Sequence, residues 1–279
     1  MPRSIVELSD VDDPRFDDYR GLNDQAYRRS YEGDLLFVAE GFVAIDRLIE
    51  SGHDIRSVLL ATSRVERFSA HLPALDERSV PVYVAAKDVI AGVVGFDLHR
   101  GVVAVADRRE HPSVAEVASI GSRFAVLEGL NDAENVGAIA RAARALGIDA
   151  LIVDPRCTDP YSRRSVRVSM GEILLLPIAR PAAADWRDVL GELGRAGVET
   201  WAMSPVPSAE SIWELEVPDR LAVVFGAEGP GLDRRTIERA TRTVRIPVRQ
   251  GVDSLNVGHA AAITFAAINR PPPPAQPLR

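Results

Sequence analysis

Cysteine is almost absent from this sequence. Cys157 is the only cysteine among 279 residues, so an internal disulfide and a cysteine-rich metal site are both excluded. No general base stands near Cys157 in the sequence, and we therefore interpret this residue as a passive thiol. The chain also offers no metal-ligand cluster, and we expect a protein that works without a metal ion.

Long hydrophobic runs are missing as well. No apolar stretch approaches the ~20 residues that a helix needs to span a bilayer. The first seven residues lack the basic-then-apolar order of a signal peptide. We therefore expect a soluble, cytoplasmic protein that does not contact a membrane.

Lysine is nearly absent, and positive charge does not dominate. Lys87 is the only lysine, and the net charge is −7. Nucleic-acid-binding proteins usually carry a basic balance, which this chain lacks, although its uneven charge distribution leaves room for a local basic face. Arginine suits bidentate phosphate contacts, but a GC-rich coding bias explains the same usage, so the arginine content decides nothing.

The first hundred residues alternate between extended and helical patterns. Short apolar runs predict four strands, and residues 42–50 place their apolar side chains on one helical face, with Gly52 where a C-cap belongs. This alternation predicts a small N-terminal α/β domain over residues 1–106. The four predicted strands are residues 35–39, 58–60, 80–84 and 102–105.

Residues 107–120 are charged at first and poor in strand signals, so we predict a linker there. Beyond it the α/β alternation resumes, and its apolar runs do not alternate with polar residues. Such runs are typical of strands buried on both faces, hence of a mainly parallel sheet in a second domain over residues 121–270. The predicted strands are 124–127, 150–153, 174–178, 200–203, 221–225 and 244–246. Helices are expected at 136–146, from Asp185 onward and at 260–268, and a disordered Pro-rich tail at 271–279.

The first of three segments with chemical potential, residues 131–141, follows a strand and opens a helix. Helix N-termini attract anions through free amides and the helix dipole. Asn135 and Arg141 lie under two helical turns apart, so both could border one cleft. The alternative is that Asn135 only caps the helix and Arg141 is a solvated surface residue.

The second segment, residues 225–232, follows a predicted buried strand and carries three glycines. Glycine lets the backbone approach a ligand closely, and α/β proteins bind ligands at the ends of such strands. Its order, G-x-x-G-x-G, differs from the G-x-G-x-x-G dinucleotide fingerprint. An ordinary tight turn remains the alternative.

The third segment contains Ile246 and Pro247 and then residues 250–259. Asp253 and Ser254 are candidate caps for the last helix. His259 is the only histidine in the three segments, and we interpret it as a packed or surface residue rather than a catalytic one.

Together the three segments resemble the SpoU/TrmH family of knotted SPOUT methyltransferases. The family patterns N-x-G-x-x-x-R, F-G-x-E-G-x-G-L and I-P…S-L-N-V occur here in order. They match Asn135, Gly137 and Arg141, then residues 225–232, then Ile246, Pro247 and residues 254–257. The resemblance covers residues 121–270. The stretch 165–171 is similar to the family's R-x-S-x-G region, whereas Ala133, Gly258 and His259 depart from the usual residues.

The N-terminal stretch 37–41, followed by a helix and a strand, is similar to the substrate-binding domain that often precedes this catalytic domain. That domain resembles the ribosomal protein L30e fold. The resemblance thus implies two parts, an RNA-binding N-terminal domain and a C-terminal α/β domain whose parallel sheet ends in a trefoil knot, an exception to the near absence of knots. It also implies a homodimer with the active site near the interface.

The resemblance further implies S-adenosyl-L-methionine as the cofactor and RNA as the partner. Gly226, Ala227, Ile246 and Leu255 are then expected to line the cofactor site, largely through backbone groups. The expected catalytic set is Arg141, Asn135, Glu228, Ser254 and Asn256.

The implied reaction is methyl transfer to a ribose 2′-hydroxyl. Guanidinium is effectively never deprotonated in proteins, so we expect Arg141 to stabilise the ribose alkoxide or hold a phosphate rather than to act as a base. A separate N-terminal domain favours ribosomal RNA over transfer RNA. The alternatives are a tRNA methyltransferase, a ribosomal antibiotic-resistance methylase and a catalytically silent RNA-binding protein of the same fold. The wrong glycine order disfavours a dinucleotide oxidoreductase.

Overall fold

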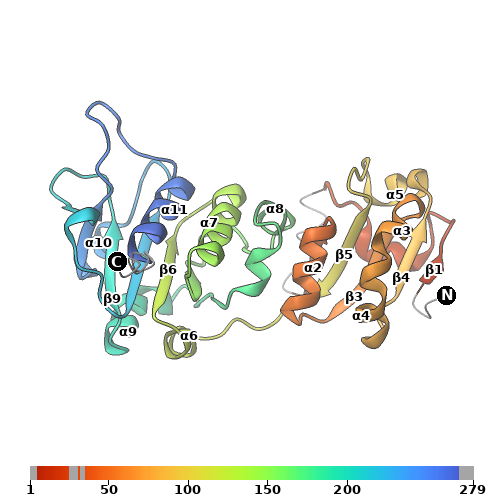
Figure 1. Ribbon diagram of the computed structural model, residues 1–279, viewed down its shortest axis with the longest axis horizontal. Coiled ribbons are helices and arrows are strands. Elements are labelled where there is room, and N and C mark those ends of the chain that lie inside the picture. Colours follow the sequence, from red (N-terminus) through yellow and green to blue (C-terminus); the bar gives the residue numbers. More distant parts are fainter. Residues whose placement is uncertain (1–4, 25–30, 32–34, 270–279) are drawn as a thin grey trace, which may run out of the picture. The chain divides into compact units, whose positions relative to one another are not determined.

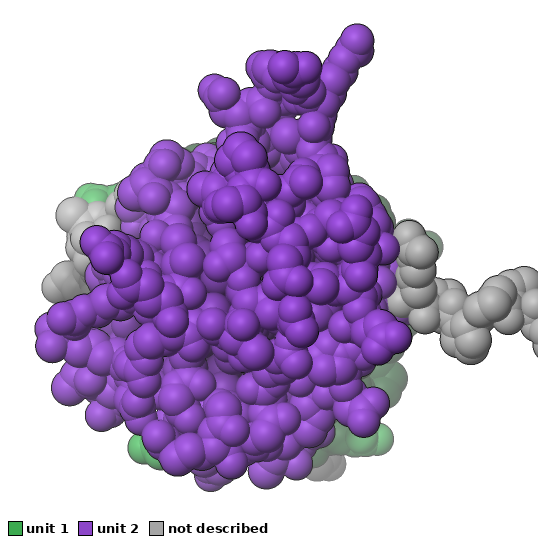
Figure 2. Space-filling view, turned by 90° about the vertical axis from the view of Figure 1, so that its left-hand side faces the viewer, with its two compact units in different colours: residues 1–110, 159–175 green, residues 111–158, 176–279 purple. Residues whose placement is uncertain are grey.

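The chain forms two compact units. The computed structural model describes residues 5–24, 31 and 35–269. The first unit comprises Met1–Glu110 and Asp159–Leu175, and the second comprises His111–Thr158 and Leu176–Arg279 (Figure 1). Figure 2 gives the two units different colours. The predicted tail at 271–279 lies outside the described residues.

The first unit is built on a five-stranded mixed sheet with the strand order β1-β4-β3-β5-β2. β4 pairs in parallel with β1 and β3, whereas β5 pairs antiparallel with β2 and β3. All four strands predicted in this region are present. β1 escaped prediction because a three-residue strand leaves almost no periodicity in the sequence. The strands are β1 (Ile5–Glu7), β2 (Leu36–Glu40), β3 (Ile55–Ala61), β4 (Val82–Ala85) and β5 (Val102–Asp107).

The helices of the first unit lie between these strands. Helix α2 buries Ala44, Ile45 and Leu48, and it ends at Gly52 in the left-handed region with φ of 70°, as predicted. The α-helices are α2 (Phe42–Ser51), α3 (Val65–Phe68), α4 (Leu72–Glu77) and α5 (Lys87–Val94). Three short 3-10 helices accompany them, η1 (Pro14–Tyr19), η2 (Thr62–Arg64) and η3 (Ser69–His71).

Residues 159–175 belong to the first unit, so their predicted place in the second domain is wrong. They contain α8 (Arg163–Val168) and the 3-10 helix η4 (Glu172–Leu175). Arg163 forms an ion pair of 2.8 Å with the buried Glu40, and Glu172 forms one of 2.8 Å with Arg47. At Gly171, φ is +81° and an added Cβ would lie 2.9 Å from the Cα of Ala44, so this turn packs directly on α2.

The second unit is built on a seven-stranded sheet with the order β10-β12-β9-β11-β6-β7-β8. All of its strand pairs are parallel, which confirms the prediction of a parallel sheet. The strands are β6 (Arg123–Glu128), β7 (Ala150–Val153), β8 (Ile178–Ala179), β9 (Glu199–Met203), β10 (Glu210–Ser211), β11 (Leu221–Gly226) and β12 (Arg242–Arg245).

Helices cover both faces of this sheet. Helices α7 (Ala133–Ala145) and α11 (Val257–Ile268) lie side by side on one face (Figure 1). Helices α6 (Val114–Ile120), α9 (Val189–Arg195) and α10 (Arg234–Arg239) pack on the other face, over a core that includes Val126 and Val224. Two 3-10 helices complete the unit, η5 (Asp185–Asp188) and η6 (Ile212–Glu214).

The predicted linker over residues 107–120 stays a prediction. The boundary at Glu110 falls inside it, and its second half forms α6, which begins with a capping box of Ser113 and Glu116. Two other local predictions are wrong. Residues 174–178 are not one strand, because η4 occupies the first two of them and β8 begins only at Ile178. Asp185 is not a helix cap, since it lies inside η5.

Candidate functional site

The glycine-rich loop folds back onto the end of β11. The Gly231 amide donates a hydrogen bond of 2.9 Å to the Ala227 carbonyl, and the two residues form an isolated β-bridge. A Cβ at Gly226 would overlap the backbone of Gly231 and Leu232. Glycine is therefore required here for close backbone approach, which an ordinary exposed turn would not demand.

A cavity of about 430 Å³ lies next to this loop. The loop lines it together with residues that follow β9 and β12, so three neighbouring parallel strands contribute their carboxyl ends, where α/β sheets bind ligands. The volume falls in the range of about 300–1,000 Å³ typical of small-molecule pockets. The lining residues are Met203, Ser204, Pro205, Phe225, Gly226, Ala227, Glu228, Gly229, Gly231, Ile246, Val248, Ser254, Leu255, Asn256, Val257 and Ala260.

Seven of the nine predicted site residues line this one cavity. They include every residue expected to contact the cofactor, Gly226, Ala227, Ile246 and Leu255, together with Glu228, Ser254 and Asn256. The structure thus brings the second and third sequence segments together, while the role of each residue stays a prediction. Met203, Ser204 and Pro205 were missed, although their position directly after a buried parallel strand is a usable signal.

The side-chain amide of Asn256 joins all three segments. Its Nδ2 donates hydrogen bonds to Asn135 Oδ1 at 2.9 Å and to Glu228 Oε1 at 2.7 Å. Its Oδ1 accepts from the amides of Gly258 at 3.0 Å and His259 at 3.3 Å. Asn256 is therefore the N-cap of α11, and the suggestion that Asp253 or Ser254 caps this helix is wrong.

Asn135 is a buried partner rather than a helix cap. Its exposed fraction is 8%, and the cap of α7 is Asp132, whose side chain accepts a hydrogen bond of 2.9 Å from the Glu134 amide. Gly258 lies close by, because a Cβ there would sit 3.2 Å from Asn256 Oδ1 and 3.4 Å from the Cβ of Ala138. A small residue at 258 therefore permits the close approach of α11 and α7.

Arg141 is exposed on α7 and is not among the residues that line the cavity. Six residues of α-helix place it about 120° around the axis from Asn135. The expectation that both residues border one cleft is therefore not met within the described part of this chain. His259 is exposed, as expected of a surface histidine.

Cys157 is a buried residue that contacts the backbone at the end of β6 and just after it. Its Sγ accepts a hydrogen bond of 3.1 Å from the Leu130 amide and donates one of 3.3 Å to the Leu127 carbonyl. Burial raises the pKa of this thiol to about 11. The thiolate that a nucleophile needs is therefore disfavoured, in line with the interpretation of a passive thiol.

The described part of the chain holds neither a metal-binding cluster nor a membrane-spanning helix. Within residues 5–24, 31 and 35–269, no group of three or more His, Cys, Asp or Glu side chains is arranged to hold a metal ion. None of the helices in these ranges is long and apolar enough to cross a bilayer.

Comparison with known proteins places this geometry in a family. The model of the SpoU rRNA Methylase family matches residues 122–266. An uncharacterized tRNA/rRNA methyltransferase of Mycobacterium tuberculosis is 42% identical over 266 residues, covering 94% of this chain and 90% of that protein. A 23S rRNA (guanosine-2′-O-)-methyltransferase of Ralstonia nicotianae is 29% identical over 240 residues, covering 82% of this chain and 94% of that protein.

The fold agrees with solved structures. An AdoMet-bound rRNA methyltransferase from Sinorhizobium meliloti superimposes with a TM-score of 0.79 at 26% identity, covering 96% of this chain and 98% of the other. The SpoU methyltransferase AviRb from Streptomyces viridochromogenes superimposes with a TM-score of 0.75 at 22% identity, covering 92% and 98%. The motif segments, the cavity that they share and the sequence match lead to one conclusion: the chain belongs to the SpoU rRNA Methylase family.

Proposed function

We propose that this protein transfers a methyl group from S-adenosyl-L-methionine to a ribose 2′-hydroxyl of ribosomal RNA. The proposal is based mainly on the cavity, which the glycine-rich loop and the segment from Ile246 to Asn256 line together. The name of the Ralstonia nicotianae relative, a 23S rRNA 2′-O-methyltransferase, supports the reaction and the substrate. The name of the mycobacterial relative leaves tRNA as the alternative substrate.

The residues present fit S-adenosyl-L-methionine. Gly226 and Ala227 supply backbone groups at a loop that only glycine allows to close, and Ile246 and Leu255 supply apolar side chains. When bound, the cofactor supplies an already activated methyl group. The protein's own contribution is then to hold the ribose oxygen in line with that group and to help remove its proton.

We assign the RNA side of the site to Asn135, Glu228, Ser254 and Asn256. The Asn256 amide holds the Glu228 carboxylate at 2.7 Å, which orients that side chain at the mouth of the cavity. Arg141 is exposed, so its guanidinium is accessible to a phosphate or to a developing ribose alkoxide. Because guanidinium keeps its proton, we assign Arg141 the stabilisation of negative charge rather than the role of a base.

We further propose a homodimer with the site near its interface, a trefoil knot whose loops are the second and third motif segments, and RNA binding by residues 1–106. Apolar side chains exposed around the cavity support the dimer, because exposed apolar patches mark interfaces. Val248, Val252 and Leu255 are 38%, 49% and 37% exposed.

The test is a pair of assays on the purified full-length chain. Calorimetric titration should show binding of S-adenosyl-L-methionine and no comparable binding of NAD. Labelled methyl groups should then appear at 2′-oxygens of ribosomal RNA isolated from a strain that lacks the protein. Tight NAD binding without a response to S-adenosyl-L-methionine would contradict the proposed cofactor, and labelling of tRNA alone would contradict the proposed substrate.

A further inference from the structure

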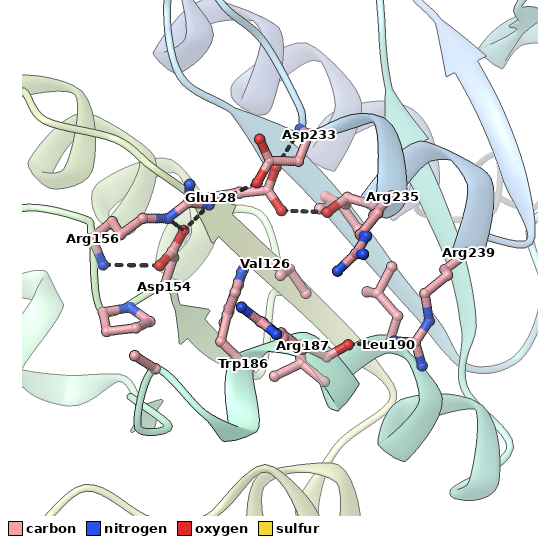
Figure 3. Close-up of a pocket in the computed structure, with 15 residues that line it drawn as sticks. Val126, Glu128, Asp154, Arg156, Trp186, Arg187, Leu190, Asp233, Arg235 and Arg239 are labelled. Atoms are coloured by element: carbon pink, nitrogen blue, oxygen red, sulfur yellow. Dashed lines mark hydrogen bonds and ion pairs between the residues drawn. The ribbon is translucent and has the colours of Figure 1, made fainter.

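The second unit contains another cavity, of about 390 Å³, which shares no lining residue with the cofactor cavity. It lies over β6 and β11 on the face that α9 and α10 cover (Figure 3). Its wall includes the apolar side chains of Val126, Val189, Leu190 and Val224. The lining also contains three carboxylates, four arginines and one tryptophan: Glu128, Asp154, Asp233, Arg156, Arg187, Arg235, Arg239 and Trp186.

The three carboxylates of this pocket already have partners. Arg156 donates to Asp154 at 2.9 Å and to Asp233 at 3.0 Å. Glu128 accepts a hydrogen bond of 2.6 Å from the Asp233 amide and another from the Thr236 hydroxyl. Burial raises the pKa of Glu128, which further disfavours its charged form. These carboxylates are therefore bonded to Arg156, to the Asp233 amide and to Thr236, and none of them is bonded to another arginine of the pocket.

Two arginines at the pocket lack such compensation. The side chains of Arg187 and Arg235 are exposed, and neither forms a hydrogen bond or ion pair with any residue that the structure describes. In Figure 3 both guanidinium groups point toward the space that the Trp186 ring borders. Arg239 differs, because its guanidinium is held by Asp188 at 2.8 Å and by the Arg187 carbonyl.

The pocket combines an aromatic ring and an apolar wall with two unpaired guanidinium groups. The ring suits the base of a nucleotide, and the guanidinium groups suit its phosphate. Bases stack on aromatic side chains in single-stranded nucleic-acid sites, and guanidinium binds phosphate in a bidentate manner. The cavity volume is within the range for a small ligand.

We propose that this arginine–tryptophan pocket, defined by Trp186, Arg187 and Arg235, binds one nucleotide of a single-stranded segment of the RNA substrate. The base stacks on Trp186 and the phosphate lies between the two arginines. The identity of that RNA as the methylated substrate rests on the proposed function, while the pocket itself rests on the contacts described above.

Neighbouring arginines on α10 provide a matched test. Arg234 is paired with Glu238 at 2.6 Å, has an 89% exposed side chain and does not line the pocket. Arg234→Ser and Arg235→Ser change the net charge equally. We expect Arg235→Ser to weaken binding of a short single-stranded RNA by roughly tenfold and to lower the salt dependence by about one phosphate contact, with Arg234→Ser close to wild type. Equal affinities of the two variants would overturn the proposal.

Tryptophan fluorescence tests the stacking. We expect the RNA to quench the wild-type protein and Trp213→Phe, but to lose its main quenching effect in Trp186→Phe. Trp186→Leu should lower RNA affinity by roughly tenfold, and Trp186→Phe should restore most of it. Unchanged quenching in Trp186→Phe would contradict the assignment. Adenosine 5′-monophosphate distinguishes a free nucleotide from a nucleotide within RNA. If it binds as tightly as the RNA does, the proposal that the pocket binds RNA is overturned.

Cofactor binding separates this proposal from the proposed function. Arg235→Ser should bind S-adenosyl-L-methionine as the wild type does, since the two cavities share no lining residue. If the wild-type protein methylates RNA while Arg234→Ser and Arg235→Ser bind it equally, only the pocket proposal fails. If the wild-type protein methylates no RNA but the two variants still differ, only the proposed function fails.

Discussion

The two cavities of the second unit lie near the carboxyl ends of the same parallel sheet, yet they differ in what builds them. The proposed cofactor cavity is lined largely by a glycine loop, apolar side chains and the Asn256 amide, which come from the ordered motif segments. The arginine–tryptophan pocket is lined by charged side chains from four separate stretches of the chain. A backbone-built site thus leaves a motif in the sequence, whereas a site built from scattered side chains does not.

The largest expected effect concerns Arg141. If it stabilises charge in the transition state, Arg141→Ala should lower the single-turnover methylation rate by about 100-fold, roughly 2.7 kcal/mol, with little change in cofactor affinity. Arg141→Lys should not restore the rate, because ammonium lacks the planar fork. Arg144→Ala is the control for a general loss of positive charge, because Arg144 is an exposed arginine on the same helix. If Arg141→Ala methylates at nearly the wild-type rate, the assignment of Arg141 to the active site is wrong.

Gly226→Ala tests whether the cofactor cavity depends on backbone approach. The added Cβ would overlap the backbone of Gly231 and Leu232, and overpacking against backbone costs about 1–3 kcal/mol. We expect S-adenosyl-L-methionine affinity to fall by about tenfold or more in a calorimetric titration. Gly251→Ala is the control, because Gly251 does not line the cavity and a Cβ there meets nothing within 4 Å, although its φ of +87° adds some backbone strain. Equal cofactor affinities for the two variants would show that the close approach is unimportant.

Asn256 combines a helix cap with a bridge between segments, and two substitutions separate these roles. Asn256→Ala removes both and should lower the free energy of unfolding by about 1 kcal/mol. Asn256→Ser keeps a capping oxygen but loses the bonds to Asn135 and Glu228. We expect Asn256→Ser to recover stability in urea unfolding but not the methylation rate. If Asn256→Ser recovers both the stability and the methylation rate, Asn256 acts only as a helix cap.

The smallest effect concerns Glu128 in the arginine–tryptophan pocket. Burial raises the pKa of this carboxyl above its ordinary value of 4.5, so the folded state holds the proton more tightly than the unfolded state. Its contribution to stability is therefore present below the ordinary pKa and is lost as the pH rises through the raised pKa. Relative to Glu128→Gln, the wild type should therefore lose stability as the pH rises above the ordinary value of 4.5.

Tryptophan fluorescence suits this measurement, because all three tryptophans, Trp186, Trp201 and Trp213, lie in the second unit. Glu216→Gln, at an exposed position, serves as the control. A difference between wild type and Glu128→Gln that stays constant with pH would contradict the direction of the shift.

Much of the fold could be predicted because it is local. Apolar runs predicted β2, β6, β7, β9 and β11 to within a residue or two, and Gly52 marked the end of α2. Where a signal was ambiguous, tertiary packing overrode it. Residues 172–175 have the composition of a strand, but the turn at Gly171 and the Glu172–Arg47 ion pair hold them as a 3-10 helix in the first unit.

By itself, the sequence determined the α/β class, the parallel sheet and the three ordered motifs that identify the family, because these depend on short periodicities and on residues near one another in the chain. Only the tertiary structure decided that Asn256 bonds Asn135, 121 positions away, that residues 159–175 join the first unit, and that Trp186 and Arg235 share a pocket. The physical reason is that such contacts arise when folding brings distant side chains together, and no local pattern records which pairs will meet.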